Sequence, residues 1–216
     1  MDQLTIVQIV AIAILPVLFA ITLHEVAHGW VALLLGDDTA ARLGRLSLNP
    51  LYHIDLVGTV LIPGLLLLLK SGFLFGWAKP VQVDFNRLRR PRRDMALVAV
   101  AGPAANLVMA IFWALAIRVA GLLDFEYVSE PLALMGQVGI TINIVLMLIN
   151  LLPIPPLDGG RIAVGLLPYD LAEKLSRIEP YGFFILLGLM YMGFLNGILG
   201  VPMQVMHSLL RGLAGL

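Results

Sequence analysis

Long apolar runs, separated by short polar segments, make up most of this chain. The longest runs cover residues 4–35, 95–121, 132–152 and 181–199, and shorter apolar segments cover 56–69 and 202–216. About 20 consecutive apolar residues suffice to cross the hydrocarbon core of a bilayer. The pattern therefore predicts an all-α polytopic membrane protein with about five to six membrane segments, folded as a single integral-membrane domain over residues 1–216.

The segment 56–69 does not follow the pattern of an ordinary span. It is apolar but short, Pro63 and Gly64 interrupt it, and Gly72 and Gly76 follow soon after. It either crosses the membrane or enters and leaves on the same side. Non-helical backbone is tolerated at membrane depth only where protein or a water-filled cavity covers it. We favour a re-entrant segment and expect the stretch from Pro80 to Val83 to be extended.

Composition supports a membrane protein and argues against some classes of partner and metal site. Hydrophobic residues make up 60% of the 216 positions and charged residues only 13%, whereas soluble domains carry about 25% charge. The formal net charge is zero, which argues against a nucleic-acid partner. The chain has no cysteine, so disulfides and cysteine-based zinc sites are excluded.

The distribution of charge predicts an orientation in the membrane. Six basic residues lie between Lys79 and Arg93 against the single acid Asp84, whereas the loop 122–131 carries three acids and no basic residue. Basic loops remain in the cytoplasm. We expect a multi-pass protein of a prokaryotic plasma membrane, with the Lys79–Arg93 loop in the cytoplasm. If 56–69 is re-entrant, the N-terminus lies outside.

The motif His24-Glu25-x-x-His28 lies inside the first apolar run. Histidines four residues apart fall on one face of a helix, so both imidazoles can bind one metal ion. The neighbouring Glu25 can accept a proton from a water on that metal. Ionisable groups inside a membrane span are costly and are functional by default. The motif predicts a zinc-dependent protease that works inside a membrane, with Glu25 as general base.

A catalytic zinc takes three protein ligands and keeps one open position. Asp158 is the best candidate for the third ligand, because it follows a long apolar run and a turn rich in proline and precedes Gly159 and Gly160. The alternative is that Asp158 caps the N-terminus of the helix that begins near Gly160. With the histidine motif present, we predict a metal ligand.

Three further polar residues lie in apolar surroundings. Asn106 and Asn150 either form interhelical hydrogen bonds or bind the substrate backbone and stabilise an oxyanion. His53, with Asp55 beside it, is a possible gate or inhibitory ligand, although a polar pair in a turn at the membrane edge is the simpler interpretation. The extended stretch at Pro80–Val83 could pair with an unwound substrate as an added strand.

The chain resembles the site-2 protease family of intramembrane zinc metalloproteases. The resemblance rests on the histidine motif, on Asn150-x-x-Pro153-x-Pro155-x-Leu157-Asp158-Gly159, and on the Gly-Pro-x-x-Asn element that ends at Asn106. It implies one zinc ion bound by His24, His28 and Asp158. It also implies a short membrane-associated β element after the first helix, and cleavage of transmembrane protein substrates near the cytoplasmic face. The length predicts a minimal form without PDZ or CBS domains.

Two other functions compete with this hypothesis. A membrane protease of the type that trims prenylated peptides shares the first motif, but its third ligand is a glutamate in a Glu-x-x-x-His context that this sequence lacks. A non-proteolytic metal-binding protein or transporter would also place ionisable groups in its spans. A transport path should distribute polar groups along its length, whereas here they cluster. The sequence assigns neither the substrate's identity nor an oligomeric state.

Overall fold

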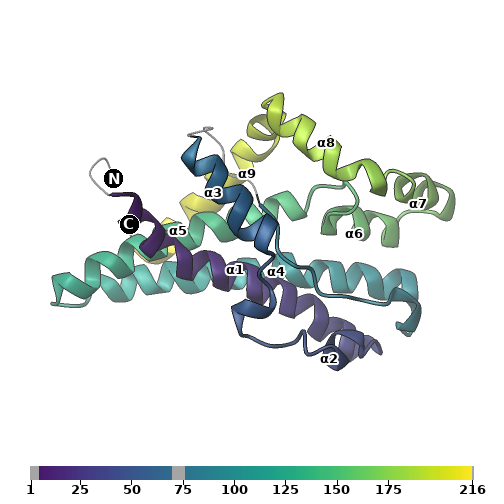
Figure 1. The fold of residues 1–216 in the computed structure, drawn as a ribbon, viewed down its shortest axis with the longest axis horizontal. Helices are drawn as coiled ribbons and strands as arrows, with labels where there is room; N and C mark the ends of the chain where they lie inside the picture. Colours follow the sequence, from purple (N-terminus) through teal and green to yellow (C-terminus); the bar gives the residue numbers. More distant parts are fainter. Residues whose placement is uncertain (1–4, 70–75, 216) are drawn as a thin grey trace.

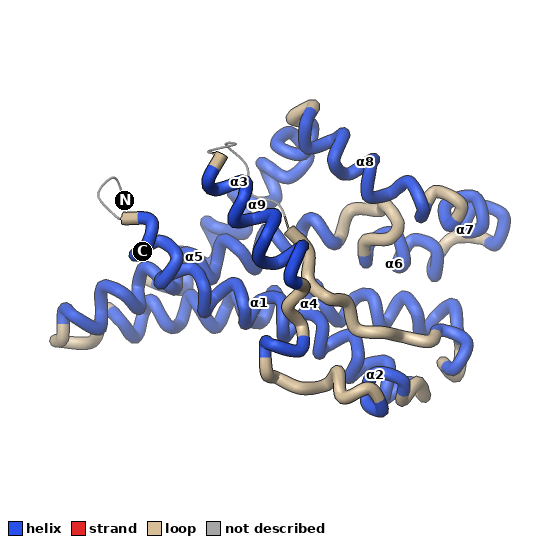
Figure 2. Tube along the Cα trace, viewed as in Figure 1, coloured by secondary structure: helices blue, strands red, loops and turns tan. Residues whose placement is uncertain are grey.

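The computed structural model describes residues 5–69 and 76–215, and all regular structure within them is helical, with no strand (Figures 1 and 2). The helices are α1 (Ile6–Leu35), α2 (Thr39–Arg42), α3 (Ile62–Leu68), α4 (Pro91–Ala120), α5 (Glu126–Asn150), α6 (Asp158–Leu166), α7 (Tyr169–Ser176), α8 (Glu179–Tyr191) and α9 (Phe194–Ala214). Short 3₁₀ turns form η1 (Pro50–Tyr52) and η3 (Phe85–Arg87), and η2 (Leu56–Leu61) is π-helical. The all-α prediction is confirmed, but the β element expected after the first helix is not.

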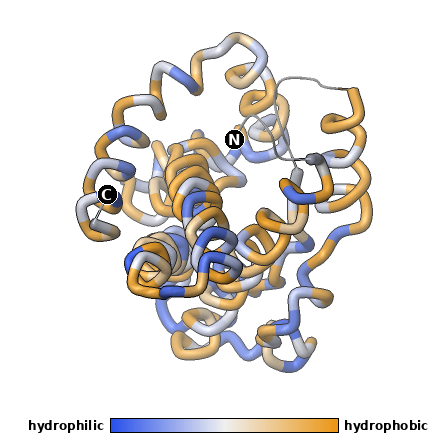
Figure 3. The backbone as a smooth tube through the Cα atoms, turned by 90° about the vertical axis from the view of Figure 1, so that its left-hand side faces the viewer, coloured by the Kyte–Doolittle hydropathy of each residue, from blue (hydrophilic) through white to orange (hydrophobic). Residues whose placement is uncertain are grey.

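Three long helices form the body of the molecule. α1, α4 and α5 lie side by side, and α4 contacts both of the others (Figure 1). By length and composition these three can each cross a membrane, and the bent pair α8 and α9 makes a fourth if it counts as one broken span. Many of their large apolar side chains are exposed, and Figure 3 shows hydrophobic positions along the long helices. The predicted count of five to six membrane segments is not confirmed.

Two predicted boundaries are wrong. The expected acidic loop 122–131 is already helical from Glu126, where a carboxylate in the first turn is stabilised by the helix dipole. The predicted span 181–199 is two helices, bent by 81° at a break that contains Gly193. Gly193 has a φ of +73°, a left-handed conformation that glycine adopts without strain. The apolar run continues across this glycine, so hydropathy alone could not place the break.

The chain between α1 and α4 leaves the long helices and returns to its starting point. We call residues 36–90 the excursion. The backbone N–H of Arg89 donates to the carbonyl of Leu35, the last residue of α1, at 3.1 Å. The excursion therefore begins and ends at one end of the bundle. Its described parts include η2 and α3, and then a non-helical stretch, residues 76–84, that we call the strap. Gly72, part of the predicted break, lies outside the described residues.

Candidate metal centre

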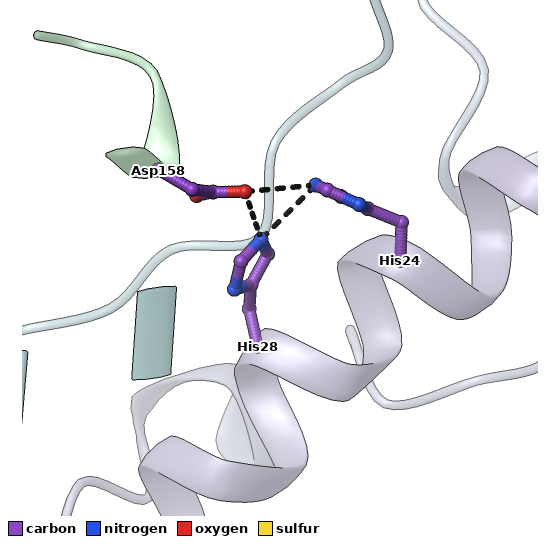
Figure 4. Close-up of side chains that lie close together, drawn as sticks. All are labelled: His24, His28 and Asp158. Carbon is purple, nitrogen blue, oxygen red and sulfur yellow. Dashed lines mark hydrogen bonds and ion pairs between the residues drawn. The ribbon is translucent and has the colours of Figure 1, made fainter. Parts of the chain in front are cut away.

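The two histidines of α1 point to one place, as the four-residue spacing predicts. The Nε2 atoms of His24 and His28 lie 3.1 Å apart. Each of these atoms lies 3.3 Å from Oδ2 of Asp158, which comes from α6 (Figure 4). His24 and Asp158 are buried, and only 12% of the His28 side chain is exposed. Residues 134 positions apart in the sequence thus form one compact cluster of potential metal ligands.

Asp158 reaches the cluster through a tight turn after α5. A Cβ on Gly159 would overlap the carbonyl groups of Leu151 and Leu152, and a Cβ on Gly160 would overlap the backbone of Pro155. Only glycine therefore lets α6 begin this close to the preceding turn. The alternative role of Asp158 as a helix cap is not observed, because Leu157 holds the N-cap position and no side chain caps the helix.

Residues of α4 form hydrogen bonds with the Nδ1 atoms of both imidazoles, on the side away from the cluster. The Nδ1–H of His28 donates to the carbonyl of Val98 at 2.7 Å, and Nδ1 of His24 lies 2.6 Å from Oδ1 of Asn106. Gly102 lies between these two residues at helical spacing, and a Cβ there would overlap both imidazole rings. The Gly-Pro-x-x-Asn element therefore has a local explanation: its glycine admits the histidine rings and its asparagine binds one of them.

The donor atoms fit a metal ion. The carbonyl of Val98 can only accept a hydrogen bond, so the proton of neutral His28 is on Nδ1 and the lone pair on Nε2 faces the cluster. Oδ2 of Asp158 is buried and has no hydrogen-bond donor among the described residues. Tetrahedral zinc, with bonds of about 2.0–2.1 Å, separates its ligand atoms by about 3.3–3.4 Å. The observed separations of 3.1–3.3 Å are close to this value.

Glu25 lines the same cavity as the cluster. The cavity has a volume of about 150 Å³, and its walls also include the strap residues Pro80 and Val81. The Oε2 atom of Glu25 accepts a hydrogen bond of 2.7 Å from the backbone N–H of Val81. This contact fixes the carboxylate between the cluster and the strap. The sequence indicated an extended stretch at Pro80–Val83 but gave no sign that its backbone binds Glu25.

Of the other predicted site residues, some line the cavity and others lie outside it. Asn150 lines the cavity and donates one hydrogen bond to Leu146 of its own helix. Asn106 is fully buried behind His24 and does not line the cavity. His53 is also buried outside the cavity, where Nε2 lies 2.9 Å from the carbonyl of Ser47 and its own carbonyl accepts from Lys79. The roles of Asn150 as oxyanion donor and of His53 as gate stay predictions.

Sequence reasoning missed one of the buried polar residues that lie behind the ligand cluster. Asn143 of α5 is fully buried and accepts a hydrogen bond from Asn106. Its position seven residues before Asn150, and thus two helical turns away on a similar face, was the available signal.

Comparisons with known proteins show to which family the chain belongs. Residues 126–192 match the sequence model described as Peptidase family M50. The chain is 40% identical over 177 residues to "Putative zinc metalloprotease YwhC" of Bacillus subtilis, with 81% of this chain and 77% of that protein covered. The chain belongs to peptidase family M50. It is therefore a membrane metalloprotease, as the resemblance to site-2 proteases implied.

More distant relatives carry similar names. The chain is 30% identical over 180 residues to "Putative zinc metalloprotease Rip2" of Mycolicibacterium smegmatis, with 83% of this chain and 66% of that protein covered. It is 28% identical over 184 residues to the protein of the same name in Mycobacterium tuberculosis, with the same coverage. No solved structure matches the chain significantly. These relatives are bacterial, in agreement with the expected prokaryotic membrane.

Proposed function

We propose that this chain is an intramembrane zinc metalloendopeptidase that hydrolyses peptide bonds of transmembrane protein substrates near the cytoplasmic face. The observation that carries the proposal is the convergence of His24, His28 and Asp158 beside Glu25 in one cavity. In this proposal residues 1–216 act as one membrane domain.

The residues of the cavity have separate roles. His24, His28 and Asp158 would hold the zinc ion, which would acidify a water molecule and polarise the scissile carbonyl. Glu25 takes the proton from that water and returns it to the leaving amine. The hydrogen bond from Val81 uses one lone pair of Oε2 and leaves the other lone pairs of the carboxylate for proton transfer. Asn150 lines the cavity and has a second amide N–H with which to bind the substrate carbonyl.

The size of the cavity bears on the form of the substrate. A volume of about 150 Å³ accepts a group of about the size of benzene. An intact helix with its side chains is about 10–12 Å wide and does not fit. A substrate helix must therefore unwind before its peptide bond reaches Glu25. The strap offers extended backbone beside the cavity with which unwound substrate can pair.

The depth of His24 along α1 and the position of the basic residues support cleavage towards the cytoplasmic side. At a rise of about 1.5 Å per residue, His24 lies about 17 Å from Leu35 at the end of α1, within the thickness of a bilayer core. The excursion returns to that end, and four arginines lie there between Arg89 and Arg93. Basic residues mark the cytoplasmic side. In this proposal the excursion is re-entrant, so that Asp158 and the histidines lie towards the same side of the membrane.

Replacing Glu25 by glutamine tests the proposal. Glutamine keeps the shape of the side chain but cannot take a proton, so cleavage of a transmembrane reporter in proteoliposomes should fall by about 10²–10⁴-fold. Zinc content, measured by mass spectrometry of the purified protein, should stay at the wild-type level. Cleavage that survives Glu25→Gln would refute the role of Glu25. Zinc binding without any cleavage by the wild type would favour the metal-binding or transport alternative.

A further inference from the structure

Two buried amides join the candidate metal centre to α5. Nδ2 of Asn106 donates to Oδ1 of Asn143 at 2.9 Å and to the carbonyl of Ala20 at 3.2 Å. Nδ2 of Asn143 donates to the carbonyl of Gly139 at 2.8 Å. Both asparagines have no solvent exposure. The three long helices are therefore connected by a continuous set of hydrogen bonds that ends at His24.

This set of hydrogen bonds has only one consistent direction. The carbonyls of Ala20 and Gly139 can only accept, so each asparagine turns its NH₂ group towards a carbonyl. Oδ1 of Asn106 therefore faces His24, and Nδ1 of that histidine must carry the proton. The lone pair on Nε2 of His24 is then directed at Asp158 and His28. The direction of the amides selects the tautomer that can bind a metal.

We propose that Asn143 is a positioning residue for the zinc ligand His24 and that it acts through Asn106. The inference rests on the zinc site of the proposed function. Asn143 touches neither the cavity nor the cluster, but its Oδ1 holds the NH₂ group of Asn106 away from His24. If the amide of Asn106 turned over, its NH₂ group would face Nδ1 and the imidazole proton would move to Nε2. In that tautomer Nε2, the atom that faces the cluster, has no lone pair for zinc.

The arrangement differs for the two histidines. His28 binds a backbone carbonyl, which cannot turn over, so its tautomer needs no further support. His24 binds a side-chain amide, which has two orientations that differ only in the placement of N and O. The amide of Asn106 therefore needs partners that distinguish N from O. Asn143 is one of the two partners that do so, and Ala20 supplies the other.

The test measures zinc affinity of the full-length protein in detergent by competition with a chelator. Asn143→Leu has a similar volume but no acceptor, and we expect zinc affinity to fall about 10- to 100-fold, as for other residues that orient metal ligands. Asn143→Asp should restore most of the affinity, because a neutral carboxyl can accept from Asn106 and donate to Gly139. Thr141→Val is the matched control, since Thr141 is exposed on the same helix and its hydroxyl donates to the carbonyl of Gln137.

A second measurement separates positioning from stability. Thermal unfolding with chelator present reports the fold alone, and the added stability upon zinc loading reports the site. A purely structural role of Asn143 would lower the melting temperature in both conditions and leave zinc affinity unchanged, and that result would overturn the inference. If Asn143→Leu does not fold, Asn143→Ser replaces it with the same expectation.

The zinc affinity of the wild-type and His24→Ala proteins is measured in the same assay. These values distinguish failure of the proposed metal site from failure of the inference about Asn143. If wild type binds no zinc, or if His24→Ala binds as well as wild type, the metal site of the proposed function is wrong. If wild type binds zinc through His24 and both Asn143→Leu and Asn143→Ser bind it equally well, only the inference about Asn143 fails.

Discussion

The helical core and the excursion meet at one cavity, but they contribute different kinds of group. The core, made of α1, α4, α5 and α6, contributes mainly side chains, which are the ligand cluster and the amides behind it, together with one backbone carbonyl, that of Val98. The excursion contributes mainly backbone: Val81 donates to Glu25, and the carbonyls of Lys79 and Pro80 accept from the buried guanidinium of Arg45. We therefore expect zinc affinity to depend on the core, and the rate of cleavage to depend on both regions.

The two regions also differ in which groups their close contacts position. In the core, glycines allow contacts so close that a single methyl group would disturb the ligands. The strap is held at separate points, by Arg45, by the carbonyl of His53 and by Asp37, which accepts from the backbone N–H of Asp84. We therefore expect single substitutions in the excursion to lower activity only partly. Substitutions in the core should remove the metal.

The largest effect is expected from Gly102→Ala. The new methyl group would overlap the imidazoles of His24 and His28, so the rings must move away from Asp158. Zinc affinity and kcat/KM should each fall at least about 100-fold, since displacements of about 1 Å cost this much in an active site. Gly188→Ala is the matched control, because a Cβ at Gly188 meets no atom within 4 Å. A Gly102→Ala protein with wild-type zinc affinity would show that the core does not fix the rings.

An intermediate effect is expected from Val81→Pro. Proline lacks the N–H that binds Oε2 of Glu25, so kcat for a transmembrane reporter should fall about 10- to 100-fold. Zinc affinity should remain within about twofold of wild type, because the strap contributes no ligand to the cluster. Val81→Ala keeps the N–H and serves as the control. Equal cleavage by Val81→Pro and Val81→Ala would contradict the role of this N–H, both towards Glu25 and in pairing with a substrate strand.

The sequence predicted which side chains converge at the site better than it predicted the groups that position them. The spacing of His24 and His28 is a rule of helix geometry, and Asp158 was identifiable because acids are rare in the apolar sequence. The hydrogen bond from Val81 was not predictable, because every residue except proline has a backbone N–H. Asn106 and Asn150 were singled out as amides in apolar helices, but Asn143 was not, although it lies two helical turns before Asn150.

The fold was predictable to a similar extent. Long apolar runs located α1, α4 and α5, since hydropathy reports burial in lipid. The bend at Gly193 was not located, because no polar residue interrupts the apolar run there. The return of the excursion to Leu35 was favoured only by combining the charge distribution with the break at Pro63 and Gly64.

The smallest effect is expected where the two regions are joined, at Asp37. This fully buried carboxylate accepts hydrogen bonds from Thr39 and from the backbone N–H of Asp84. Burial alone would raise the pKa of Asp37, but these hydrogen bonds and the charge of Arg87 outweigh it and lower the pKa below the usual value. The lowered pKa means that Asp37 stabilises the fold above about pH 4, the range of unfolded aspartate, and that this stabilisation is lost as pH falls through the pKa of the folded protein.

Asp37→Asn should therefore lower the free energy of unfolding at pH 7 by about 1.5–3 kcal/mol, the usual contribution of hydrogen bonds to a charged group. It should also flatten the fall in stability as pH drops below about 4, measured by thermal unfolding with chelator present. Asp38→Asn, at a neighbouring carboxylate that is 46% exposed, is the control and should change stability by less than about 1 kcal/mol. Zinc affinity at pH 7 should be unchanged, because Asp37 holds the strap and not the ligands. A loss of zinc in Asp37→Asn would mean that the core depends on the excursion after all.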